Sequence, residues 1–156
     1  MNAIPQRTLN ILLADDDIDD CLFFRGAIEK SPVRTTLTIV HDGKKLMQLL
    51  TTEDYILPAV LFLDLNMPRQ NGFECLSEIK LHARLRQIPV IMFSTSNELA
   101  VVDRLFSNGA HYFIRKPSIF SQFEEIILQT LLLINKESVL QPSREDFVLM
   151  HSSASI

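Results

Sequence analysis

The residues best suited to chemistry in this sequence are three aspartates, a serine and a lysine, and each follows a short apolar run. They are Asp15, Asp16, Asp64, Ser94 and Lys116. Short continuous apolar runs are typical of buried strands, and in an open α/β sheet ligand sites form beyond the carboxyl ends of the strands. The pattern therefore predicts that these five side chains meet at one edge of a sheet.

Three carboxylates at one edge predict a cation site. Asp15, Asp16 and Asp64 would repel one another, and the pKa of one would rise unless a cation lay between them. Mg²⁺ is the natural ion, because it takes one or two protein carboxylates together with water and a phosphate oxygen.

Lys116 and Ser94 indicate that the site also receives an anion. A lysine is a compact positive charge that can hold phosphate, and the Ser94 hydroxyl can donate a hydrogen bond to a phosphoryl oxygen. An aspartate nucleophile needs no general base, since it is ionised at neutral pH. The set is typical of aspartyl phosphate formation. Taken singly, Lys116 could be an ordinary surface lysine, Ser94 a helix cap and Asp64 a loop residue.

Five apolar runs alternate with five helical patterns, which predicts an α/β fold with a doubly wound parallel sheet. The expected strands are 11–14, 37–40, 59–63, 90–93 and 111–114, and the expected helices are 19–30, 44–50, 72–82, 98–108 and 118–135. The polar residues 94–97 are expected to cap the helix that starts at Glu98, and Asn108-Gly109 to end it. Asp17, Asp19 and Asp20 are interpreted as acids stabilised by a helix N-terminus.

Composition and charge exclude several classes of protein. With 156 residues, of which 47% are hydrophobic, the chain has the length of one domain and is not disordered. A pI of about 5.5 argues against a nucleic-acid module, so no direct nucleic-acid binding is expected. No signal peptide or membrane span is visible, and only Cys21 and Cys75 are present, which favours a cytoplasmic protein.

The organisation expected along the chain is a short lead, one domain and a tail. The lead covers 1–8, the domain 9–135 and the tail 136–156, where Pro142 and several serines interrupt any period. The tail is expected to be loose, with docking through Phe147, Val148, Leu149 and Met150 as the alternative. No output domain is expected after residue 135.

With these residues in place, the chain resembles the receiver domain of two-component response regulators over about residues 9–135. The resemblance is carried by 11–17, by 63–72 with its Asp-x-Asn-Met-Pro stretch, by 88–95 and by 109–117, in the order and spacing of the family. It implies a flavodoxin-like three-layer sandwich with five strands in the order 2-1-3-4-5. The pair Asp19-Asp20 is similar to the residues at this place in the stand-alone receivers of the cyanobacterial phytochrome response regulator type.

The resemblance also implies a role for each site residue. Asp64 would accept a phosphoryl group, and Asp15, Asp16, Asp64 and the Asn66 carbonyl would hold Mg²⁺. Lys116 would contact the phosphoryl group, with a cis bond to Pro117.

Ser94 and Phe113 would form a conformational switch in which the aromatic ring follows the hydroxyl inward, although Phe113 can also be an ordinary core aromatic. Thr95 stands where the family usually has a small residue, which predicts slow loss of phosphate.

The function expected from this resemblance is that of a single-domain response regulator in a phosphorelay, not an enzyme. Its phosphoryl donor would be a sensor histidine kinase or a histidine phosphotransfer protein, and a homodimer could form through the fourth helix, fifth strand and fifth helix. The alternatives are a degenerate receiver that binds partners without phosphorylation and an aspartate-nucleophile phosphatase. The phosphatase is disfavoured because Asn66 stands where its second aspartate would be.

Overall fold

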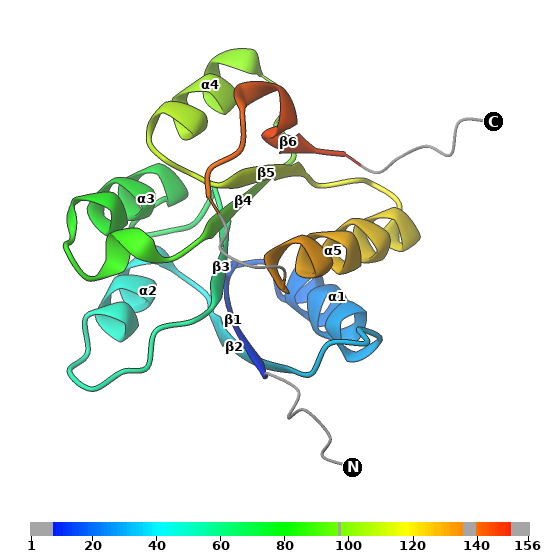
Figure 1. Ribbon diagram of the computed structural model, residues 1–156, viewed down its shortest axis with the longest axis horizontal. Coiled ribbons are helices and arrows are strands. Elements are labelled where there is room, and N and C mark those ends of the chain that lie inside the picture. Colours follow the sequence, from blue (N-terminus) through cyan, green and yellow to red (C-terminus); the bar gives the residue numbers. More distant parts are fainter. Residues whose placement is uncertain (1–7, 97, 136–139, 151–156) are drawn as a thin grey trace, which may run out of the picture.

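A parallel sheet forms the middle layer of the structure, a computed structural model that describes residues 8–96, 98–135 and 140–150 (Figure 1). Its strands are β1 (Leu9–Ala14), β2 (Thr35–Val40), β3 (Val60–Asp64), β4 (Val90–Ser94), β5 (Tyr112–Arg115) and β6 (Val148–Leu149). The helices are α1 (Ile18–Glu29), α2 (Gly43–Leu50), α3 (Gly72–Leu81), α4 (Leu99–Ser107) and α5 (Phe120–Asn135). The α/β class predicted from the alternating pattern is confirmed.

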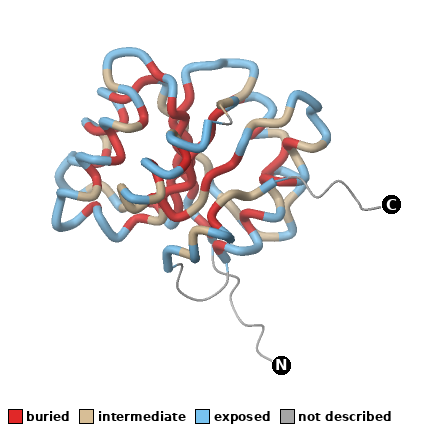
Figure 2. The backbone as a smooth tube through the Cα atoms, turned by 90° about the horizontal axis from the view of Figure 1, so that it is seen from above, coloured by how far each residue is buried: buried red, intermediate tan, exposed pale blue. Residues whose placement is uncertain are grey.

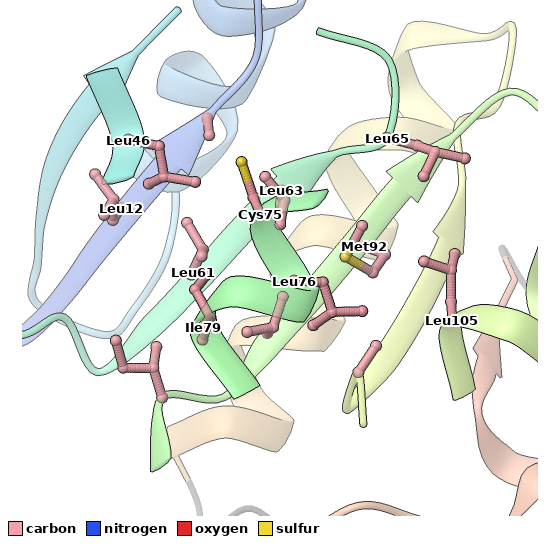
Figure 3. Packing of buried hydrophobic residues seen from close by; sticks show 14 of the residues in the cluster. Leu12, Leu46, Leu61, Leu63, Leu65, Cys75, Leu76, Ile79, Met92 and Leu105 are labelled. Carbon is pink, nitrogen blue, oxygen red and sulfur yellow. The ribbon is translucent and has the colours of Figure 1, made fainter. Parts of the chain in front are cut away.

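Helices cover both faces of the sheet, as the uniformly apolar strands predict. All residues of β3 and β4 are buried, and Figure 2 shows buried residues concentrated along the middle of the molecule. Helices α1 and α5 lie on one face, and α2, α3 and α4 lie on the other (Figure 1). On the second face, Leu61, Leu63 and Met92 of the sheet pack against Leu76 and Ile79 of α3 (Figure 3).

Side-chain caps begin several of the helices. Asp17 accepts a hydrogen bond from the Asp20 N–H at the start of α1, and Asn71 opens α3 in a capping box. The predicted cap of α4 is wrong: its N-cap is Glu98, which makes no side-chain cap bond, while the Ser96 hydroxyl accepts from the Glu98 N–H. Asn97 lies outside the described residues. The predicted end at Asn108-Gly109 is confirmed, with Gly109 at φ 90°.

The strand order is β2-β1-β3-β4-β5-β6. The predicted order 2-1-3-4-5 is confirmed, but the prediction of five strands is wrong, because a sixth strand pairs in parallel with β5. We call residues 140–150, which contain β6, the C-terminal strap. The expectation of a loose tail is wrong for these residues, and the alternative of a docked segment holds for them; 136–139 and 151–156 lie outside the described residues.

The strap docks because one aromatic ring is fully buried and several polar groups hold the flanking chain. Phe147 is 0% exposed and packs edge-on against Phe106 of α4, with ring centroids 5.2 Å apart. Its carbonyl accepts a hydrogen bond from the Phe113 N–H of β5, at 3.0 Å. The Gln141 amide donates to the carbonyls of Phe106 and Ala110. Met150 is 69% exposed and takes no part in this packing.

None of the helices in the described part of the chain has both the length and the apolar content needed to cross a membrane.

Candidate functional site

The parallel register brings the predicted site residues to one edge of the sheet. Ala14 of β1 pairs with Leu63 of β3, so the next residues, Asp15 and Asp64, lie side by side at the ends of these neighbouring strands. Ser94 pairs with Arg115, so Lys116 leaves β5 beside the end of β4. All the strands run in the same direction, and their carboxyl ends therefore gather the side chains that the sequence predicted would meet.

Asp15, Asp16 and Asp64 each offer a carboxylate oxygen within 4.8 Å of the others. Asp15 is 1% exposed and Asp64 5%, whereas Asp16 is exposed. The two buried carboxylates are anchored by the backbone, since the Asp17 N–H donates to Asp15 and the Asn66 N–H donates to Asp64. An all-oxygen donor set of this size fits a hard divalent cation such as Mg²⁺.

Lys116 lies among the carboxylates and bonds to three of them. Its Nζ is 2.9 Å from Asp20 Oδ2, 3.0 Å from Asp15 Oδ2 and 3.3 Å from Asp64 Oδ2. An ammonium group has three N–H donors, so these contacts use all of them. The Lys116 side chain is only 9% exposed, which excludes the alternative of an ordinary surface lysine.

Charges and burial shift the pKa values of two groups in opposite ways. Burial raises the pKa of Asp15 to about 7, with Asp64 adding to the rise and Lys116 opposing it. Burial would lower the pKa of Lys116, but the charges of Asp64 and Asp15 outweigh it and raise that pKa above its ordinary value. The predicted rise in one carboxyl pKa is therefore found at Asp15, although burial rather than repulsion is its largest cause.

A pocket of about 260 Å³ opens above these groups. It is lined by Asp16, Asp17, Asp20, Asp64, Asn66, Thr95 and Lys116. Thr95 is exposed at its wall. The pocket therefore gives solvent, or a small anionic group, access to Asp64 and to the Lys116 ammonium together.

Ser94 and Phe113 are buried beside the site rather than in its pocket. Ser94 is 1% exposed, and its hydroxyl accepts a hydrogen bond from the Ser96 N–H at 3.0 Å. The Ser94 carbonyl accepts from the Lys116 N–H at 2.8 Å, which ties the end of β4 to the start of the lysine loop. Phe113 is 1% exposed and packs in the core on the α3 and α4 side of the sheet.

The cis bond expected before Pro117 is not found, because the peptide bonds of the described residues are all trans. Trans is the ordinary state of an X–Pro bond, by about 0.5–1 kcal/mol. Lys116 reaches its three carboxylates with this bond in the trans form.

Asp20 is the site residue that the sequence interpretation missed. Asp17 lies at the start of α1, as expected of a helix-start acid, and caps it, but Asp20 lines the pocket and makes the shortest contact with Lys116. One signal was available: Asp20 stands four residues before the buried Phe24 and so shares its helix face, whereas Asp19 precedes Phe23, which is 43% exposed.

Comparisons with known proteins agree with this geometry. The sequence matches the family model described as response regulator receiver domain over residues 11–128. Two-component response regulator ORR5 of Oryza sativa is 32% identical over 108 residues, which cover 69% of this chain and 78% of that protein. Probable methanogenesis regulatory protein FilR2 of Methanothrix harundinacea is 30% identical over 120 residues, which cover 75% of this chain and 77% of that protein.

Two solved structures of response regulators share the fold over most of their length. The phosphorylated cyanobacterial phytochrome response regulator RcpA superposes with a TM-score of 0.79 at 27% identity, covering 87% of this chain and 100% of that one. The Mn²⁺-bound form of response regulator Rcp1 gives a TM-score of 0.77 at 25% identity, covering 86% and 99%. The chain belongs to the response regulator receiver domain family of two-component signalling.

Proposed function

We propose that this chain is a phosphoacceptor of a phosphorelay and that Asp64 carries the phosphoryl group. The observation that supports this most strongly is the position of Asp64 at the pocket floor, with one oxygen on Lys116 and with Asp15 and Asp16 beside it. Two neighbouring carboxylates are less suited to accept the group: the Asp17 side chain is engaged in capping α1, and Asp15 is more deeply buried than Asp64.

In the proposed reaction, an Asp64 oxygen attacks the phosphorus of a phosphohistidine. A new O–P bond forms, and the P–N bond breaks with its electron pair leaving on the imidazole. Lys116 balances the charge that arrives with the phosphoryl oxygens. The Asn66 N–H holds the other Asp64 oxygen at 3.1 Å, which fixes the direction of the carboxylate.

Asp15, Asp16 and Asp64 would hold Mg²⁺, with the Asn66 carbonyl proposed as a further ligand. When bound, the ion supplies positive charge that neutralises the carboxylates and the transferred phosphoryl oxygens. Because the pKa of Asp15 is raised to about 7, a proton would compete with the cation for this carboxyl group below that pH.

The proposed response to phosphorylation is a shift between two packings at Ser94 and Phe113. The Ser94 hydroxyl now accepts a hydrogen bond from the Ser96 N–H. A phosphoryl group on Asp64 would draw this hydroxyl away from Ser96 and toward the phosphoryl oxygens. Phe113 belongs to a chain of contacts that reaches the strap, because its N–H donates to the Phe147 carbonyl. In this proposal the charge at Asp64 is read out on α4, β5 and the strap.

A protein donor would approach across α1 and the start of α5. Exposed apolar side chains occur on both segments: Ile18, Leu22 and Phe23 on α1, and Ile119 and Phe120 around the start of α5. Phe23 and Phe120 are in ring contact, with centroids 4.6 Å apart, so the two segments form one surface. We propose that a sensor histidine kinase or a histidine phosphotransfer protein docks here.

We also propose, as the resemblance implies, a cytoplasmic protein with a receiver unit over 9–135. The two cysteines are free and buried, which agrees with a reducing compartment. A homodimer through α4, β5 and α5 would have to include the strap, because β6 occupies the edge of β5. Sedimentation of the chain before and after phosphorylation tests that dimer.

The function is tested by incubation with acetyl phosphate, a small phosphodonor, with and without Mg²⁺, followed by intact mass measurement. We expect one added phosphoryl group that depends on Mg²⁺ and is absent from Asp64→Asn. A native protein without an adduct, tested at saturating donor and Mg²⁺, would instead favour a degenerate receiver that binds partners unphosphorylated.

A further inference from the structure

Lys116 has a carboxylate partner outside the three-aspartate group that could hold a metal. That partner is Asp20, whose Oδ2 lies 2.9 Å from Nζ, closer than Asp15 at 3.0 Å or Asp64 at 3.3 Å. Among the described residues, the carboxylates grouped closely enough to hold a metal are Asp15, Asp16 and Asp64, and Asp20 is not one of them.

The three contacts of Lys116 differ in what happens to them when the site is used. Asp15 and Asp64 would both turn to the cation, and Asp64 would also gain the phosphoryl group. Asp20 has neither task, and its side chain is 24% exposed at the pocket wall. Of the three carboxylates on Lys116, Asp20 is therefore the one left with no other task during the proposed phosphorylation cycle.

We propose that Asp20 is a positioning residue that holds the Lys116 ammonium over the pocket and limits how many of its N–H groups reach the phosphoryl oxygens. The inference rests on the proposed function and deepens it. Since the ammonium has three donors and Asp20 keeps one, two remain for the phosphoryl group. The contact with Asp20, which belongs to α1, also restricts the flexible four-carbon side chain of Lys116 to one position.

Asp20 is well placed for this task because α1 itself is firmly anchored. The Asp20 N–H donates to the Asp17 side chain at 3.0 Å in the N-terminal cap. One turn later, Phe24 of the same helix face is 0% exposed and packs on Phe62 of β3 and Phe93 of β4. The carboxylate therefore projects from a helix turn that is fixed to the central strands.

Three substitutions at position 20 separate charge from position. Asp20→Ala removes both the charge and the contact, Asp20→Asn keeps an acceptor oxygen but loses the charge, and Asp20→Glu keeps the charge on a longer side chain. Asp19→Asn is the matched control, because Asp19 is an exposed acid in the first turn of the same helix and is not one of the carboxylates on Lys116.

The experiment measures the rate of phosphorylation of the full chain by acetyl phosphate at saturating Mg²⁺, over a range of donor concentrations. We expect Asp20→Ala to lower the maximal rate about tenfold, as loss of a residue that orients a functional group does. We expect Asp20→Asn to keep the maximal rate within about threefold and to lower the half-saturating donor concentration roughly threefold, because one negative charge facing an anion is gone. Asp20→Glu should recover most of the rate lost in Asp20→Ala.

Mg²⁺ affinity, measured by calorimetry because the chain has no tryptophan for a fluorescence assay, should change less than about threefold in the Asp20 variants, since Asp20 lies outside the ligand group. Thermal unfolding verifies that each variant is folded.

The outcomes distinguish this inference from the proposed function. A wild-type protein that is phosphorylated, with Asp20→Ala matching both it and Asp19→Asn, overturns the positioning role alone. A large loss of Mg²⁺ affinity in Asp20→Asn also overturns it, because Asp20 would then act as a metal ligand. A wild-type protein that is never phosphorylated overturns the proposed function and this inference with it.

Discussion

Replacing Phe147 with alanine tests whether the C-terminal strap is part of the folded domain. The ring is fully buried and contacts Phe106, while the carbonyl of the same residue binds the Phe113 N–H. Removing a buried Phe side chain costs about 3–5 kcal/mol. The polar side-chain contacts of the strap are weaker: each Gln141 bond contributes about 1 kcal/mol, and the exposed Arg144–Asp103 pair about 0–1 kcal/mol.

We therefore expect Phe147→Ala to lower the free energy of unfolding by about 3–5 kcal/mol. With a urea slope of ~2 kcal/mol per M, the midpoint falls by roughly 1.5–2.5 M. Limited proteolysis should also cut the variant within the strap under conditions where the wild-type protein stays intact, because the remaining contacts do not hold the segment.

Leu140→Ala is the control for this measurement. Leu140 is an apolar residue of the same strap but is 78% exposed, so its loss should change stability by less than about 0.5 kcal/mol. If Phe147→Ala and Leu140→Ala unfold at the same urea concentration and resist protease equally, then Phe147 is not buried and the sixth strand is wrong.

Three further predictions concern His111, Thr95 and Gly72. Burial lowers the pKa of His111 to about 4, and its Nδ1 accepts from the Val90 N–H; since the unfolded chain binds the proton first, stability should fall by up to about 3 kcal/mol as the pH drops from 6.5 to 4. In urea titrations at several pH values, the stability of His111→Gln should fall less steeply with decreasing pH than that of the wild-type protein. The raised pKa of Asp15 acts in the opposite direction, but it affects both proteins equally and drops out of the comparison. Parallel curves of stability against pH would contradict this prediction. Thr95→Ala should lose phosphate several-fold faster than the wild-type protein in a mass time course, because the Thr95 side chain at the pocket wall would restrict the water that attacks the phosphoryl group; an unchanged rate counts against this role of Thr95. Gly72→Ala should slow phosphorylation and destabilise the fold by about 1–3 kcal/mol, since its Cβ would meet the Asp64 carbonyl oxygen at 2.5 Å; normal behaviour would show that this loop adjusts freely.

The edge of the sheet that carries the site was predictable because strand direction and chain order suffice to place it. Asp64 and Ser94 end β3 and β4, Asp15 and Lys116 directly follow β1 and β5, and parallel strands bring their carboxyl ends together whatever the details of packing. A raised pKa of one carboxyl group was also predictable, although its largest cause, the burial of Asp15, was not the repulsion that the sequence suggested. These are consequences of topology, which the periodicity of apolar residues encodes strongly.

Two features were not predictable, because they depend on partners far away in the sequence. Asp19 and Asp20 are identical acids in the same run; the helix face of Phe24 favours Asp20, but its contact with Lys116, 96 residues later, appears only in the fold. The sixth strand is two residues long, too short to show a period, and is stabilised by the burial of Phe147 against α4. Local propensity carries little information where tertiary contacts decide the structure.

The most direct test of the central claim locates the phosphoryl group on the chain. The protein is phosphorylated with acetyl phosphate and Mg²⁺ and treated with borohydride, which reduces an aspartyl phosphate to homoserine, and its peptides are then sequenced by mass spectrometry. The account predicts homoserine at position 64 and at no other aspartate. Homoserine at Asp15, Asp16 or Asp20, or a phosphorylated protein that yields none, would contradict it.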